Sequence, residues 1–169
     1  MSNPEKKIVY VAEKDGCAAE ILNGILQFCG REKYIDVIKG TALSDNIKPT
    51  VILLCTLCRE IKTDDCQCVI SEYSLTQDAR FSCAKPCKTY SSKTDSADFT
   101  ARNIRFAQDG FVAFEIVGVG IIGRVKLNTR DSGTVSDALA ASAAAVGIGI
   151  PFADVLKALN SIELENENL

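Results

Sequence analysis

The sequence of 169 residues contains no histidine and no tryptophan, and only one methionine and four prolines. Without histidine there can be no Ser-His-Asp triad, no Cys-His pair and no HExxH zinc site. No apolar run reaches the ~20 residues that a membrane-spanning helix needs. The first seven residues are polar, with no apolar signal-peptide core behind them. We therefore expect a cytoplasmic protein that has no membrane partner.

Acidic residues slightly outnumber basic ones, 22 to 19, which gives a formal net charge of −3. A chain with this balance gives no reason to expect nucleic acid as a partner. The hydrophobic fraction of 47% and the charged fraction of 24% are typical of a folded globular domain. The length predicts a single domain over 1–169, with an α/β core at 1–90, an antiparallel meander at 91–128 and C-terminal helices at 134–162.

The first half alternates short β-type runs with helical segments, which favours an α/β fold with a mostly parallel sheet flanked by helices. The run at 50–55 is continuously apolar, as expected for a strand buried on both faces. The predicted strands are Lys7–Ala12, Tyr34–Ile38, Thr50–Cys55, Gln67–Ser71 and Lys88–Tyr90, and the predicted helices are Cys17–Cys29 and Glu72–Arg80.

The pattern changes after Ser91. Alternating residues near 99–128, with a turn at Asp109-Gly110, predict a small antiparallel β meander of three strands. Two C-terminal helices follow: an alanine-rich one over Asp137–Val146 and a final one that starts near Pro151. The small side chains of the first allow another element to approach closely. We expect this helix and the exposed sheet edges to be contact surfaces for a partner.

Eight cysteines are the largest chemically capable set in the chain. Cys55 and Cys58 form a CxxC motif, and Cys66 and Cys68 form a CxC motif, so the four are candidate ligands for zinc or an iron–sulfur cluster. Cys55, however, ends a buried strand and Cys68 begins an apolar one, and free cysteine packs well as a small hydrophobe. Core packing is the leading interpretation, and a metal site or a redox CxxC pair remains an alternative.

A second candidate site lies between the first strand and the first helix. Backbone N–H groups at a helix N-terminus bind phosphate, and glycine lets the ligand come close. The five residues of this turn are Lys14, Asp15, Gly16, Cys17 and Ala18. A working Walker-type loop needs more glycines, followed by Lys and Ser or Thr. An ordinary strand–helix turn is therefore the leading interpretation, although Lys14 is placed to attract an anion.

Several motifs follow one another in a recognisable order along the second half: Lys88–Ser91, Asp98–Ile104, Gly110–Phe114, Gly123–Leu127, Asp137–Ala143 and Gly147–Phe152. In their order and spacing they resemble the central, ATP-binding domain of the Mur ligases, the amide-forming enzymes of peptidoglycan synthesis in the cell wall. The N-terminal half is similar more loosely, through the strand, loop and helix over Ile8–Cys29. The resemblance implies a P-loop-like α/β fold.

The chain also departs from the pattern of that family. The family's phosphate loop has the form Gly-Thr-Asn-Gly-Lys-Thr-Thr, and here Gly16 is kept while Cys17 and Ala18 stand in the places of its Lys and Thr. The family's Asn-x-x-Asn, which contacts the nucleotide base, falls on Thr134 and Asp137. The segment that supplies a Mg²⁺-binding Glu and a carboxylated Lys has no counterpart, nor do the two flanking domains.

These departures lead to an expected function without catalysis. Loss of the loop lysine and of the metal removes the charges that neutralise phosphate during transfer. We therefore expect a binding or regulatory module that uses no cofactor and acts through a protein partner or a homo-oligomer. One alternative is the nucleotide-binding part of an ATP- and Mg²⁺-dependent amide ligase that another chain completes. The other is a cysteine-based metal or redox protein holding zinc or an iron–sulfur cluster.

Overall fold

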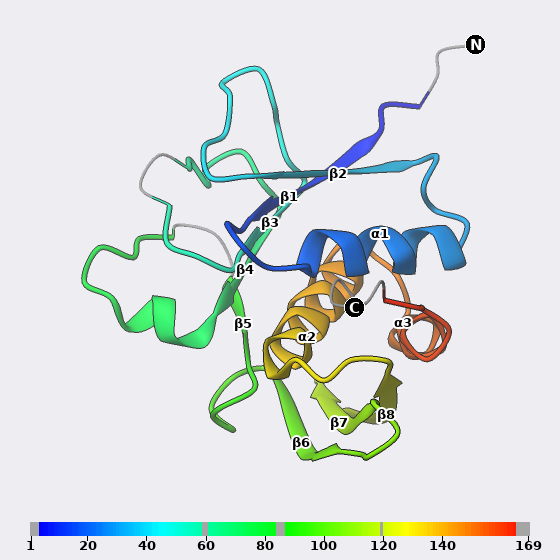
Figure 1. Ribbon diagram of the computed structural model, residues 1–169. Helices are drawn as coiled ribbons and strands as arrows, with labels where there is room; N and C mark the ends of the chain where they lie inside the picture. Colours follow the sequence, from blue (N-terminus) through cyan, green and yellow to red (C-terminus); the bar gives the residue numbers. More distant parts are fainter. Residues whose placement is uncertain (1–3, 59–60, 84–86, 119, 165–169) are drawn as a thin grey trace.

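The computed structural model describes residues 4–58, 61–83, 87–118 and 120–164. In these residues an eight-stranded sheet has the order β2-β1-β3-β4-β5-β6-β7-β8, with three α-helices beside it (Figure 1). The strands are β1 (Lys7–Ala12), β2 (Ile35–Gly40), β3 (Val51–Leu54), β4 (Cys68–Glu72), β5 (Cys87–Ser91), β6 (Phe99–Phe106), β7 (Val112–Gly118) and β8 (Ile121–Leu127). The helices are α1 (Ala18–Phe28), α2 (Ser132–Gly147) and α3 (Phe152–Leu159).

The sheet is parallel from β2 through β6 and antiparallel from β6 to β8. This confirms the predicted α/β class and the antiparallel meander. All four residues of β3 are buried, in agreement with its continuous apolar sequence. The meander is part of the main sheet, because β6 pairs in parallel with β5 through Tyr90–Phe99 and Ser91–Thr100.

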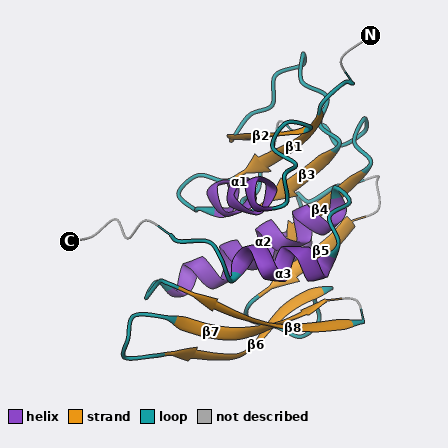
Figure 2. Ribbon diagram, turned by 90° about the vertical axis from the view of Figure 1, so that its right-hand side faces the viewer, coloured by secondary structure: helices purple, strands orange, loops and turns teal. Residues whose placement is uncertain are grey.

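The α-helices all cover one face of the sheet, and loops cover the other face of its parallel strands (Figures 1 and 2). A large core lies between the helices and the sheet. A smaller core on the opposite face is built around Tyr10, Ile52 and Val69, and the side chains that close it come from loops. The predicted helix over Glu72–Arg80 is there only as a short 3₁₀ helix, η1 (Tyr73–Gln77), none of whose residues is buried.

Helix α2 is buried along most of its length. Its alanines are at most 1% exposed, because their small side chains let the sheet and α1 approach from different sides. The prediction that this helix offers a contact surface is therefore wrong. It also starts five positions earlier than expected, since the Asp131 side chain accepts a hydrogen bond from Gly133 N and caps it. No helix in the described ranges is long and apolar enough to cross a membrane.

Candidate functional site at the start of helix α1

The candidate site lies where the carboxyl ends of parallel strands meet the N-terminus of α1. Glu13 follows β1 directly, Cys55 follows β3, and the backbone N–H of Cys55 donates to Ala12 O at 2.9 Å. Tyr90, near the end of β5, forms a hydrogen bond with the Cys55 thiol. Ligands of open α/β sheets bind at this edge. The fold therefore places the predicted phosphate loop at the expected end of the sheet.

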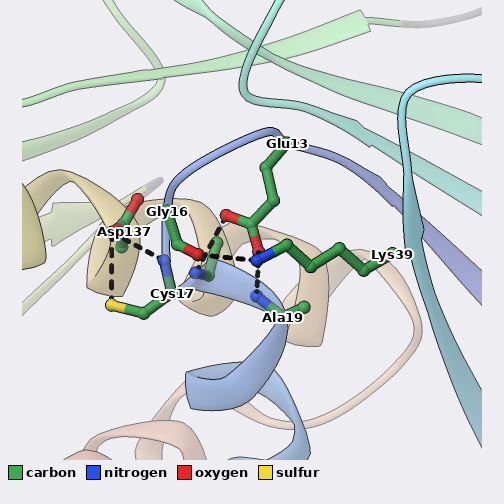
Figure 3. Close-up of polar contacts among 7 residues, drawn as sticks. Glu13, Gly16, Cys17, Ala19, Lys39 and Asp137 are labelled. Atoms are coloured by element: carbon green, nitrogen blue, oxygen red, sulfur yellow. Dashed lines mark hydrogen bonds and ion pairs between the residues drawn. The ribbon is translucent and has the colours of Figure 1, made fainter.

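Glu13 occupies the N-terminus of α1 with its own carboxylate. Glu13 is buried, and its side chain accepts hydrogen bonds from Ala18 N at 3.1 Å and from Ala19 N at 2.9 Å (Figure 3). These are the first two residues of α1, whose N–H groups have no partner within the helix. A negative charge here is also favoured by the helix dipole. Glu13 thus makes the contacts that a phosphate would make.

Asp137 reaches the same place from α2. Its Oδ2 accepts hydrogen bonds from Cys17 N at 3.1 Å and from the Cys17 thiol at 3.2 Å (Figure 3). Together with the two bonds to Glu13, this contact engages three consecutive backbone N–H groups, those of residues 17–19. The two carboxylates therefore close the anion-binding end of α1 from within the chain.

Lys39, in β2, balances one of the two charges. Its Nζ donates to Gly16 O at 2.8 Å and lies 3.5 Å from Glu13 Oε1. The ammonium is partly open to solvent, whereas the side chain of Glu13 is only 2% exposed. With two carboxylates and one ammonium the cluster keeps a negative charge, and this charge opposes the approach of an anion.

Gly16 is required by the close packing of the two acids. A Cβ at this position would lie 2.6 Å from Glu13 Oε2 and 3.0 Å from Asp137 Oδ1, both tighter than ordinary contact. Glycine in such a loop usually admits a ligand. Here it admits the chain's own carboxylates.

Burial and neighbouring acids keep the thiols of the site protonated. Burial and the charge of Asp137 raise the pKa of Cys17 to about 12, so that its thiol donates to Asp137 at neutral pH. Burial raises the pKa of Cys55 to about 12, although the hydrogen bond from Tyr90 lowers it. Burial also raises the pKa of Asp137 above its ordinary value. At neutral pH neither thiol supplies the thiolate that nucleophilic attack requires.

The other predicted residues lie outside this cluster. Lys14 and Asp15 are exposed and make none of the contacts that close the N-terminus of α1. Thr134 is buried in the first turn of α2, where its hydroxyl lies 3.4 Å from that of Thr129. Of the two residues that match the family's base contact, only Asp137 reaches the loop.

Glu13 and Lys39 are not predicted as site residues from the sequence alone. The available signal was an acid at the end of a buried strand, five positions before the helix amide to which it bonds. Cys17 precedes α1 and makes no side-chain cap of its own, so the helix depends on another acceptor. For Lys39 the sequence held no comparable signal, because only the pairing of β1 with β2 brings it to this edge.

The four cysteines proposed as metal ligands do not form one group. Cys55 and Cys68 pack against the core on the helix side of the sheet, and Cys58 and Cys66 belong to the core on the loop side. Within the described parts of the chain, no three cysteine, aspartate or glutamate side chains lie close enough together to hold a metal ion. The eight cysteines, all among the described residues, form no disulfide bond with one another.

Comparison with solved structures identifies the fold. MurF from Acinetobacter baumannii superposes with a TM-score of 0.68 over 97% of this chain and 48% of its own, at 12% identity. A UDP-N-acetylmuramoyl-L-alanyl-D-glutamate–2,6-diaminopimelate ligase gives a TM-score of 0.73 at 10% identity, over 94% and 46%. The chain has the Mur-ligase fold.

Further Mur ligases agree with this result. MurF from Thermotoga maritima, solved in complex with ADP, gives a TM-score of 0.70 at 13% identity over 95% of this chain and 49% of its own. The chain thus spans about half the length of these Mur ligases, and the predicted resemblance is confirmed. No protein-family model and no curated protein sequence matches the chain.

The Mur-ligase resemblance implies ATP and Mg²⁺, and the residues of the site do not fit them. The N–H groups that would hold phosphate oxygens donate to Glu13 and Asp137 instead. Cys17 and Ala18 offer neither the ammonium nor the hydroxyl that a phosphate loop uses for phosphate and metal. A phosphate placed here would face two carboxylates at close range, so no step through ATP follows from this geometry.

Proposed function

We propose that the chain is a non-catalytic module with the Mur-ligase fold that acts by binding another protein chain. The observation that carries the proposal is the internal occupation of the α1 N-terminus by Glu13 and Asp137. Each bond to an ionised carboxylate contributes about 1.5–3 kcal/mol, so an incoming phosphate must displace favourable contacts before it gains its own. The module accordingly uses neither ATP nor a metal ion.

The structural neighbours support a role connected with Mur ligases. Those neighbours are MurF enzymes and related peptide ligases, one of them solved with ADP. We propose that the chain keeps their scaffold for assembly, either as a homo-oligomer or with a separate protein of cell-wall synthesis. Light scattering on the purified chain, alone and mixed with candidate ligases, distinguishes these two forms of assembly.

Isothermal titration calorimetry with ADP and ATP in the presence of Mg²⁺ tests the proposal. We expect no saturable heat up to about 1 mM nucleotide, a concentration that corresponds to a binding free energy of about −4 kcal/mol. Binding of either nucleotide in the micromolar range would overturn it. That result would favour the alternative of a ligase half that another chain completes.

A further inference from the structure

The three-stranded meander has one face that the fold leaves open. Val112, Phe114 and Ile116 of β7 are buried toward α2 and α3, so the residues between them point to the opposite side. In Figure 2 the helices lie above β6–β8, and no described helix or strand lies beneath these strands. Because β6–β8 are antiparallel neighbours, their outward residues form rows across this face.

Two of these rows carry the basic residues of the face. Glu115 pairs with Arg102 on one side and Arg124 on the other, and Ala113 pairs with Arg105 and Lys126. These two rows therefore hold four cations and one acid, and Asp95 and Asp109 pair with Arg102 and Lys126 from the adjoining loops, on a chain whose net charge is −3. We call the six residues of the two rows the basic face.

A groove runs over the middle of the basic face. It has a volume of about 470 Å³, and the small side chain of Ala113 lies in its lining between those of Arg105 and Lys126. A bulge in β6 shapes it: Asn103 has a positive φ of 53°, and its amide donates to Glu115 Oε2 at 2.8 Å. The groove is thus a feature of the strand geometry and does not depend on a loop.

The cations of the groove form few and weak ion pairs within the described part of the chain. Arg124 lies 3.6 Å from the half-buried Glu115, and Lys126 lies 3.5 Å from Asp109 in an exposed pair. Arg105 has no ion-pair partner within the described part of the chain. Exposed pairs at such distances contribute little, so an external carboxylate can compete for these groups.

We propose that the basic face binds an extended acidic peptide segment of a partner protein. Arg124 and Lys126 are two positions apart on β8, about 6.6 Å, and this spacing matches that of alternate side chains on an extended peptide. A Glu-x-Glu segment therefore presents its carboxylates in register with the two cations. This inference rests on the proposed binding role but not on the state of the α1 N-terminus.

The surroundings of the groove favour a peptide over nucleic acid. The next outward row pairs Val117 with Ile122, and Ile122 is 63% exposed, so aliphatic side chains of a peptide find apolar contact there. Phe114, the aromatic residue in the groove lining, is 2% exposed and offers no ring on which a base can stack.

Fluorescence anisotropy with a labelled peptide, Glu-Ser-Glu-Ser-Glu-Leu-Leu, tests this inference. We expect saturable binding at low salt, weakened at least about tenfold when glutamine replaces each glutamate. The double variant Arg105→Glu/Lys126→Glu should weaken it by at least the same factor. The matched control Lys48→Glu/Lys62→Glu, which makes the same charge change at exposed loop residues, should change it less than about twofold.

Three results would overturn the inference: no saturable binding at about 1 mM peptide, equal weakening by the two double variants, or tighter binding of a single-stranded oligonucleotide in the same groove. If the charge reversal unfolds the chain by circular dichroism, Arg105→Gln/Lys126→Gln replaces it with the same expected direction. Nucleotide calorimetry on the same protein reports separately on the proposed function, so the two failures are distinguishable.

Discussion

At the scale of single residues, the carboxylate of Glu13 takes the place of a bound anion. It lies in the position where a phosphate-binding loop would receive its ligand, it satisfies Ala18 N and Ala19 N, and it is held by Lys39. The helix is capped by a residue five positions upstream of its first turn instead of by its own N-cap. The site is therefore a structural unit whose parts should depend on each other energetically.

Replacing Glu13 with glutamine should destabilise the fold by about 1–3 kcal/mol at neutral pH. The amide keeps one acceptor oxygen but loses the charge that pairs with Lys39 and with the helix dipole. Urea denaturation followed by circular dichroism gives the difference. Glu20→Gln is the matched control, because Glu20 is an exposed acid in the first turn of the same helix. Equal losses of stability in the two variants would show that the buried contacts of Glu13 contribute no more than an exposed acid does.

Asp137 predicts an unusual pH dependence of stability. Its pKa is raised above the ordinary 3.8, mainly by burial and also by the charge of Glu13, so the folded state holds the proton more tightly than the unfolded state. The contribution of this group to stability is complete below about 3.8 and is lost as the pH rises through the folded pKa. Asn at 137 does not titrate. The stability of the native chain relative to Asp137→Asn should therefore fall as the pH rises from about 4 toward 7.

Urea denaturation of both proteins at several pH values checks this prediction. A relative stability that rises with pH would mean that Cys17 and the helix N-terminus, whose hydrogen bonds lower the pKa of Asp137, outweigh burial.

The sequence predicts where the site lies, but it does not predict that the carboxylates of Glu13 and Asp137 fill it. Gly16, Cys17 and Ala18 were identified because a turn between a strand and a helix is visible in residue order. Asp137 was identified only through the family resemblance, as a base contact. Its bond to Cys17 spans 120 positions, and the pairing of Lys39 with Glu13 needs β1 and β2 side by side. Contacts of that range are set by the fold and leave no local pattern.

At the scale of elements, Asn160 fastens the end of α3 to the edge of the sheet. Its Oδ1 accepts from Lys126 N at 2.9 Å, and its Nδ2 donates to Arg124 O and to Leu156 O, each at 3.0 Å. The side chain thus pairs with the outer edge of β8 as a neighbouring strand would. This also occupies the edge at Arg124–Lys126 against pairing with another chain.

Asn160→Ala should lower the free energy of unfolding by about 1–2 kcal/mol and expose the contact between α3 and β8 to solvent. Hydrogen exchange read by mass spectrometry should show faster exchange at Lys126 and in the last turn of α3. Ser161→Ala is the control, because the Ser161 hydroxyl makes one exposed bond within the same turn, to Lys157 O. Unchanged exchange at Lys126 in Asn160→Ala would contradict the assigned role.

Gly123 sets how closely α3 lies against β8. A Cβ at this position would overlap the side chain of Leu156. Gly123→Ala should therefore destabilise the fold by about 1–3 kcal/mol. The double variant Gly123→Ala/Leu156→Ala should lose less stability than the sum of the losses in the two single variants, because truncating Leu156 makes room for the new methyl group. Additive losses in urea denaturation would place the strain elsewhere.

The types of most elements could be predicted from the sequence, but which elements cover each face of the sheet could not. The bounds of β1 agree with the predicted strand, and β6 and β8 lie within the predicted meander, because period-two patterns and turn residues are local signals. The segment after β4 forms only a 3₁₀ turn, and its Leu75 packs, partly buried, on the loop-side core. Whether a crossover forms a helix or a loop is decided by the face it must cover.

At the scale of the whole molecule, the charges are separated between two places. The carboxyl edge of the parallel strands holds Glu13 and Asp137 with the single balancing Lys39, and the outer side of the meander holds the basic face. The edge that binds anions in P-loop-like folds is thus acidic, while the cations lie on strands away from it. This distribution agrees with a scaffold whose recognition surface is the meander.

Amide NMR of residues 17–19 during titration with Mg²⁺ and ADP tests whether Glu13 and Asp137 close the N-terminus of α1 to nucleotide. We expect that the resonances of Cys17, Ala18 and Ala19 do not shift up to about 1 mM nucleotide, and that Glu13→Gln alone moves those of Ala18 and Ala19. Saturable shifts of these three amides in the native chain would show that nucleotide displaces the carboxylates, and would contradict a site closed from within.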